Sequence, residues 1–165
     1  MEERGSEVLL VADSNILFRF LLVSERVRRI VYSLRVVIYT PDWAVVEVNK
    51  YLDFIREKLE RRGVSSVMLR LVLTELYSRV IVVPKSVYGD KIEEARRIAG
   101  LFDPKDAPFI ALALKLGVPI WTEDKELIRY GFESGRYIAL DTRAIEELLK
   151  GGELGEVLEG LKKRI

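Results

Sequence analysis

Acidic side chains cluster in one part of this chain, at the ends of two of its most apolar segments. Between residues 102 and 127 these acids include Asp103, Asp106, Glu123 and Asp124. Carboxylates in such places either cap helices and face solvent, or bind a hard cation such as Mg²⁺ or Mn²⁺. The rest of the sequence has to decide between a surface role and a metal-binding role.

The composition limits the chemistry that is available. The chain has 165 residues, which fits one domain, and it contains neither histidine nor cysteine. This excludes most nucleophilic triads, thiolate metal sites and disulfides. Any hydrolytic chemistry must therefore come from carboxylates, hydroxyls, lysines or a metal ion held by oxygen.

Charge and hydropathy bear on partners and location. The net charge is +1, so nucleic acid would have to be bound by local patches rather than by a global field. Apolar runs stay well short of the roughly 18 residues of a membrane span, and the N-terminus is acidic. We expect a soluble, cytoplasmic protein without membrane contact. Glutamine is absent and 32% of residues are charged, which predicts a thermophile source.

Apolar strands alternate with helical patterns along the chain. Strands are predicted at 8–12, 35–40, 80–84, 118–121 and 136–140. One helix is predicted from Pro41 to Gly63, with Thr40 as its N-cap. This alternation predicts an α/β fold with a central parallel sheet of about five strands and helices on both faces.

The domain organisation follows from the same pattern. Residues 1–150 are predicted to form one domain, and residues 151–165 an amphipathic helical extension of it. The extension begins at Gly151-Gly152 and carries an apolar stripe: Leu154, Val157, Leu158, Leu161 and Ile165. The stripe either packs on the body of the domain or docks a partner or a second copy of the chain.

Four acids are predicted to meet at the carboxyl edge of the sheet, where open α/β sheets bind ligands. Asp13 follows the first strand and Asp124 the fourth, while Glu47 lies in the second turn of the helix after the second strand. Asp106 must open its helix, because Pro108 fits only in the first four helical positions. Each acid alone also fits a helix cap or a solvated surface residue. Together they would repel one another unless a cation neutralised them.

The motifs around these acids resemble those of the PIN-domain nucleases, of the archaeal or thermophile type. They are VADSNIL around Asp13, the Thr-Pro pair upstream of Glu47, Asp106-Ala107 before FIALALKLG, and the Trp-Thr-Glu-Asp run that ends at Asp124. The resemblance implies a three-layer α/β/α sandwich. It also implies that the acids serve as metal ligands and catalytic residues, with supporting polar groups beside them. The ligands would be Asp13, Glu47, Asp106 and Asp124, and the supporting groups Ser14, Asn15 and Thr122. Asp103 and Glu123 add acids beside the matched positions.

The same resemblance implies a metal-dependent endoribonuclease that uses one or two Mg²⁺ or Mn²⁺ ions on single-stranded RNA. It would be either the toxin of a toxin–antitoxin pair or an RNA-processing nuclease, and a homodimer. The long segment 54–80 and the tail after residue 150 speak against a compact toxin. Candidate RNA-contacting cations are Arg26, Arg29, Arg56 and Arg61, which also fit a solvated helix face with acidic neighbours.

Other interpretations remain. A catalytically silent PIN-like module that binds RNA or a protein is the main alternative. A phosphoacceptor receiver domain would need a lysine where RYIALDTR offers arginine. A haloacid-dehalogenase-type phosphatase would need a second aspartate at the position of Asn15.

Overall fold

A parallel sheet forms the centre of the computed structural model, which describes residues 6–100 and 104–165. Its five strands in this part of the chain have the order β3-β2-β1-β4-β5, and each neighbouring pair is parallel. The strands are β1 (Val8–Ala12), β2 (Val36–Pro41), β3 (Val80–Val83), β4 (Ile120–Trp121) and β5 (Ala139–Leu140). The predicted fold class is confirmed.

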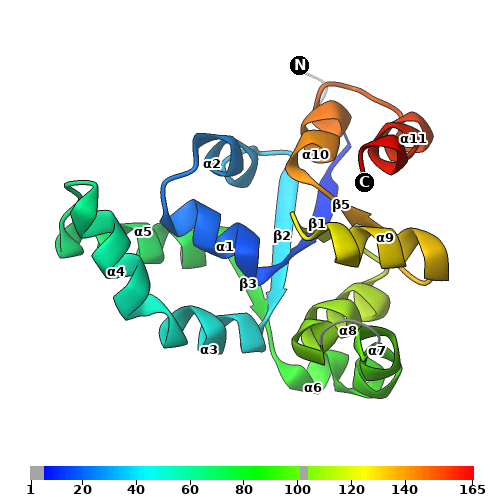
Figure 1. The fold of residues 1–165 in the computed structure, drawn as a ribbon, viewed down its shortest axis with the longest axis horizontal. Coiled ribbons are helices and arrows are strands. Elements are labelled where there is room, and N and C mark those ends of the chain that lie inside the picture. The colour runs from blue at the N-terminus through cyan, green and yellow to red at the C-terminus, as the bar shows by residue number, and fades with distance from the viewer. Residues whose placement is uncertain (1–5, 101–103) are drawn as a thin grey trace.

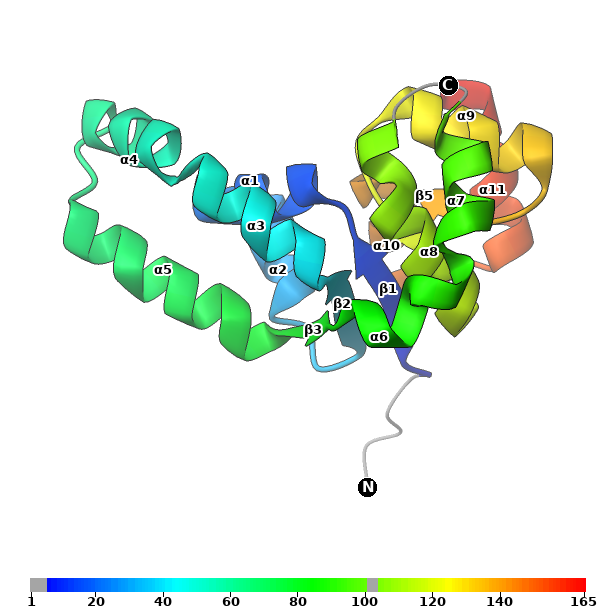
Figure 2. The same cartoon turned by 90° about the horizontal axis from the view of Figure 1, so that it is seen from below.

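Helices cover both faces of this sheet. Figure 2 shows α1 to α5 on one side of β1, and α7, α8 and α9 on the other. The helices are α1 (Ser14–Leu21), α2 (Glu25–Val31), α3 (Asp42–Lys50), α4 (Leu52–Arg61), α5 (Ser66–Arg79), α6 (Lys85–Tyr88), α7 (Ile92–Ala99), α8 (Ala107–Leu116), α9 (Lys125–Ser134), α10 (Thr142–Leu149) and α11 (Leu154–Arg164). Short 3₁₀ turns, Gly89–Lys91 and Pro104–Asp106, precede α7 and α8. The result is a three-layer α/β/α sandwich, as right-handed crossovers require.

The core fixes the carboxyl edge of the sheet in place. β1 ends in three fully buried residues, Leu10 to Ala12, and Ala12 pairs with Trp121 of β4. α8 packs on β1, β2 and β4 with α7 outside it, so it is apolar on most of its surface. Burying an aliphatic or aromatic side chain contributes roughly 1.5–3 kcal/mol. The residues that follow β1 and β4 therefore start from well-anchored strand ends.

The start of the helix after β2 differs from the prediction. Thr40 and Pro41 belong to β2, and α3 begins at Asp42. Thr40 is no N-cap, because its Oγ1 donates a hydrogen bond of 3.0 Å to the carbonyl of Ala12 in the neighbouring strand. A contact across the sheet thus outweighs the local capping signal.

The single helix predicted up to Gly63 is also wrong, because the chain breaks at Tyr51 into α3 and α4. The rings of Tyr51 and Phe18 pack perpendicular to one another, with 5.7 Å between the ring centroids. Gly63, at φ +78°, ends the second helix as expected. In Figures 1 and 2, α4 and α5 extend together away from the sheet. β4 and β5 are also shorter than predicted, with two residues each.

The C-terminal helix lies against the body of the protein. α11 packs on α10, and Val157 and Leu161 of the predicted stripe are buried. Leu154 remains partly exposed. None of the helices in the described part of the chain is long and apolar enough to cross a membrane.

Candidate functional site

Asp13 is a buried carboxylate at the end of β1. The residue is 4% exposed, and its side chain caps α1 by accepting a hydrogen bond of 2.8 Å from the backbone N–H of Ser14. Its other oxygen accepts from Thr122 Oγ1 at 2.7 Å and from Asn15 Nδ2 at 2.9 Å. All of these donors are neutral groups. The two supporting side chains therefore contact the predicted ligand directly.

The electrostatics of Asp13 follow from this environment. The pKa of Asp13 is raised from the ordinary 3.8 to about 6, mainly by burial and in smaller part by the charge of Asp124. The hydrogen bonds from Thr122 and Ser14 oppose the rise. Burial without a cation disfavours the ionised form, whereas a bound cation would favour it. Asp13 is thus a carboxylate that a positive charge would stabilise.

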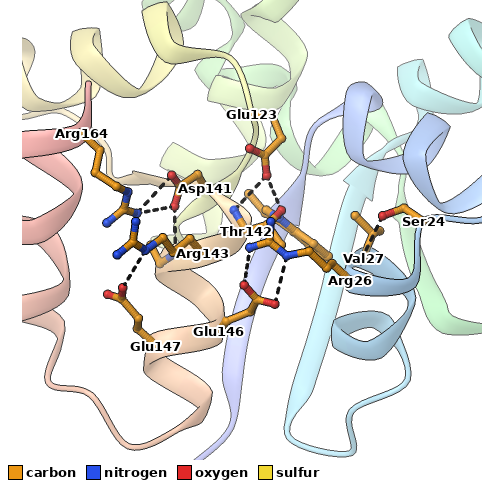
Figure 3. A network of polar contacts seen from close by, with 12 residues as sticks. Ser24, Arg26, Val27, Glu123, Asp141, Thr142, Arg143, Glu146, Glu147 and Arg164 are labelled. Atoms are coloured by element: carbon orange, nitrogen blue, oxygen red, sulfur yellow. Dashed lines mark hydrogen bonds and ion pairs between the residues drawn. The ribbon is translucent and has the colours of Figure 1, made fainter.

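The loop after β4 turns its acids in opposite directions. Thr122 accepts a hydrogen bond of 3.0 Å from the backbone N–H of Asp124, and Asp124 caps α9 through the N–H of Glu126. Glu123 instead accepts hydrogen bonds from the N–H and hydroxyl of Thr142 at the start of α10. Figure 3 shows Glu123 in that network. Glu123 is thus held by the start of α10 rather than by the residues around Asp13.

Glu47 and Asp106 approach the same edge from two helices. Ser14 Oγ lies 3.5 Å from Glu47 Oε2, which places Glu47 of α3 beside the residue that follows Asp13. Asp106 precedes α8 as its N-cap without a side-chain capping bond, and Pro108 lies in the first turn as expected. Burial raises the pKa of Tyr137, and the charges of Asp106 and Asp124 add to this rise. The charges of Asp106 and Asp124 therefore both lie close enough to Tyr137 to affect its pKa. Asp103 lies outside the described residues.

The carboxylate oxygens of the four acids are chemically suited to bind a hard cation. Carboxylate oxygens are the ligands that Mg²⁺ and Mn²⁺ prefer. Asp13 and Asp124 repel one another across a buried site, and a divalent ion would relieve that repulsion. Within residues 6–100 and 104–165, however, no three acids stand in an arrangement that could already hold a metal ion. Metal binding by the four acids thus stays a prediction.

The four arginines predicted to contact RNA each form an ion pair with an acid. Arg26 pairs with Glu146 of α10, as Figure 3 shows, and Arg29 with Glu25. The α4 pairs are Arg56 with Asp53, at 3.0 Å, and Arg61 with Glu57, at 3.9 Å. These exposed pairs are typical of a solvated helix face. RNA contact by these arginines stays a prediction.

Sequence reasoning missed a cavity of about 530 Å³ next to the acids. Trp43 and Val46 of α3 line it, together with Lys105 and Pro108 beside Asp106. The available signal was an aromatic residue one helical turn before Glu47. It does not reveal a cavity, because the other walls come from α6 and α7.

Comparison with known proteins identifies the family. The model of the PIN domain family matches residues 11–150. Among solved structures, the chain resembles VapBC2 from Rickettsia felis, solved bound to a DNA fragment from their promoter. The match has a TM-score of 0.57 and 12% identity over 81% of this chain and 98% of that chain. FitAcB from Neisseria gonorrhoeae matches with a TM-score of 0.47 and 16% identity over 81% of this chain and 97% of that chain. No curated protein sequence matches. Since the family model extends from β1 through α10, the chain belongs to the PIN domain family.

Proposed function

We propose that the protein is a metal-dependent endoribonuclease that cleaves single-stranded RNA. The observation that carries the proposal is the buried carboxylate of Asp13, held by neutral donors and beside the charge of Asp124. PIN domains are generally nucleases, which supports hydrolysis of a nucleic acid. The whole chain lacks histidine, so catalysis would depend on carboxylates and metal.

The four acids would share one task. Asp13, Glu47, Asp106 and Asp124 would hold one or two Mg²⁺ or Mn²⁺ ions. Such an ion lowers the pKa of a bound water and stabilises charge on the phosphoryl group. Thr122 and Asn15 orient the carboxylate of Asp13 from one side. Ser14 connects the backbone next to Asp13 with Glu47. The expected product of cleavage carries a 5′ phosphate.

The biological setting is the finer part of the proposal. The fold shared with VapBC2 supports the toxin of a toxin–antitoxin pair, with an antitoxin as protein partner. An RNA-processing nuclease is the second candidate. It is favoured by the extra length of this chain, because the VapBC2 match covers 98% of that chain but only 81% of this one. A cytoplasmic location and a homodimer belong to the proposal as well. The buried Val157 and Leu161 give the homodimer no support.

The test is cleavage of a labelled single-stranded RNA with Mn²⁺ or with EDTA. We expect metal-dependent cleavage by the wild type and its loss in Asp106→Asn. The matched control is Asp53→Asn, an exposed acid on α4 that pairs with Arg56. It should cleave like the wild type, and circular dichroism should show that both variants are folded.

Two results would contradict the proposal. Cleavage by Asp106→Asn at the wild-type rate would remove Asp106 from the site. A wild type that binds no Mn²⁺ and cleaves no RNA would favour the silent module. In that module, Asp106→Asn would leave the affinity for RNA unchanged.

A further inference from the structure

The cavity next to Glu47 and Asp106 is formed by elements far apart in the sequence. Its walls come from α3, α6, α7 and the start of α8. Its volume of about 530 Å³ lies in the range of sites that take a small molecule or one unit of a polymer. It is therefore large enough to hold a nucleotide.

Two of the elements that line the cavity also carry acids of the proposed catalytic site. Trp43 and Glu47 are four residues apart on α3, so they share one face of that helix. Lys105 and Ala107 line the cavity and flank Asp106 in the chain. A polymer bound at the acids would therefore place its next unit at or near this cavity.

One wall of the cavity offers an aromatic surface. Trp43 is 38% exposed, whereas the other tryptophan of the chain, Trp121, is 0% exposed. Tyr88, Ile92 and Ala107 contribute buried apolar lining behind it. An accessible indole beside an apolar floor is suited to stacking against a nucleobase. Stacking of this kind requires an unpaired base.

The rim of the cavity is cationic. Among the described residues that line it, Lys85, Arg96 and Lys105 are exposed cations, and Asp42 is an acid. Asp42 is engaged within the protein, because it accepts hydrogen bonds from Tyr88 Oη at 2.5 Å and from the N–H of Lys85 at 3.1 Å. Arg96 has an exposed acid, Glu93, at 3.8 Å, and such pairs are weak. Among the described lining residues, cations thus outnumber acids, which favours an anionic ligand.

We propose that this cavity binds one unpaired nucleotide of the RNA, with its base on Trp43 and its phosphate near Lys85, Arg96 and Lys105. The inference rests on the proposed function, because it assigns a subsite for the same substrate. It explains why the RNA substrate would be single-stranded, because a base can stack on Trp43 only when it is unpaired. It also places the RNA-binding cations in this cavity rather than on the exposed faces of α2 and α4.

The experiment measures binding of a fluorescein-labelled single-stranded RNA to the full chain in EDTA, by anisotropy. We expect Trp43→Leu to weaken binding about tenfold, as for the loss of one stacked base. Phe54→Leu is the matched control, because Phe54 is an exposed aromatic residue of α4 outside the cavity. RNA should also quench tryptophan fluorescence in the wild type, since Trp43 is the accessible indole.

A second set of variants tests the cations independently of Trp43. Lys85→Ala and Arg96→Ala should each weaken binding several-fold and reduce the slope of log affinity against log salt by about one. Lys162→Ala and Lys163→Ala, which change exposed cations of α11 outside the cavity, should leave both quantities near wild type. Thermal melts establish that each variant is folded.

The outcomes separate this proposal from the proposed function. The subsite would be overturned if Trp43→Leu and Lys85→Ala bind RNA like the wild type, even if Asp106→Asn abolishes cleavage. A peptide of a partner protein would then be the occupant to test. Weaker binding by both variants in a protein that cleaves no RNA would support the subsite and contradict the nuclease. Equal affinity for a duplex of the same sequence, or no RNA binding by the wild type, would also overturn the subsite.

Discussion

Asp13 and Asp141 occupy equivalent places in the fold but have opposite surroundings. Each follows a strand of the sheet directly, β1 or β5, and each caps the helix that comes next. Asp141 accepts hydrogen bonds from Arg164 Nη2 at 2.9 and 3.1 Å, an ion pair seen in Figure 3. Asp13 accepts only from neutral donors among the described residues and has the acid Asp124 nearby.

The difference separates a structural acid from a candidate ligand. The guanidinium of Arg164 neutralises Asp141, and this ion pair joins α11 to the start of α10. Asp13 also caps a helix, but among the described residues the donors to its carboxylate are all neutral. Capping alone therefore does not tell the two roles apart. The sign of the neighbouring charges does.

The largest expected effect is on cleavage. Asp13→Asn should reduce Mn²⁺-dependent cleavage by about 10³-fold, because losing a ligand removes several kcal/mol of charge stabilisation. Asp141→Asn should keep cleavage within about twofold and lower stability by about 1 kcal/mol, since its ion pair is mostly shielded from solvent. Initial rates and thermal melts of the two variants check this pair. Equal loss of cleavage in both would erase the distinction.

The next effect is on stability against pH, measured in EDTA. Folding raises the pKa of Asp13 from 3.8 to about 6, so its ionisation costs the folded state about 3 kcal/mol. That stability is fully present below pH 4 and is lost as the pH rises through 6. Relative to the wild type, Asp13→Asn should therefore gain several degrees in melting temperature between pH 4 and pH 7. A difference that stays constant with pH would contradict the raised pKa.

Glu146 supplies a control of opposite sign. The hydrogen bond from Arg26 holds the pKa of Glu146 below its ordinary value. Its stabilising contribution is present above the unfolded value and is lost as the pH falls. Glu146→Gln should therefore be less stable than the wild type at neutral pH, and the difference should shrink in acid.

The smallest effect compares two buried threonines. Thr122→Val removes the hydroxyl that donates to Asp13, a bond that lowers its pKa. At limiting Mn²⁺, the acid limb of the cleavage profile should move up by roughly one pH unit. Thr142→Val alters the Glu123 contact instead, so it should lower stability and leave the limb in place. Equal shifts in both variants would contradict a specific role for Thr122.

Sequence patterns predicted the features that local chemistry decides. The alternating strands gave the parallel sheet, and Pro108 gave the start of α8. The thermophile source, the oligomeric state and the location of the protein stay predictions.

Features that depend on distant contacts were missed. The Thr40 hydroxyl donates a hydrogen bond to a backbone carbonyl of β1. The predicted helix is interrupted at Tyr51, whose ring contacts Phe18. The cavity requires Trp43 and Lys85, which are far apart in the chain, to line the same pocket. No local pattern in the sequence predicts contacts between residues that are so far apart in the chain.

The two edges of the sheet bear on the behaviour of the protein at high concentration. An unpaired edge strand can recruit another chain and start aggregation. β5 has only two residues, and β3 has four and is followed by Pro84, which has no N–H to offer. Ile81 and Val82 of β3 are exposed, so the shortness of this edge matters. The sheet therefore gives an incoming strand little backbone to pair with, which favours solubility of the folded chain.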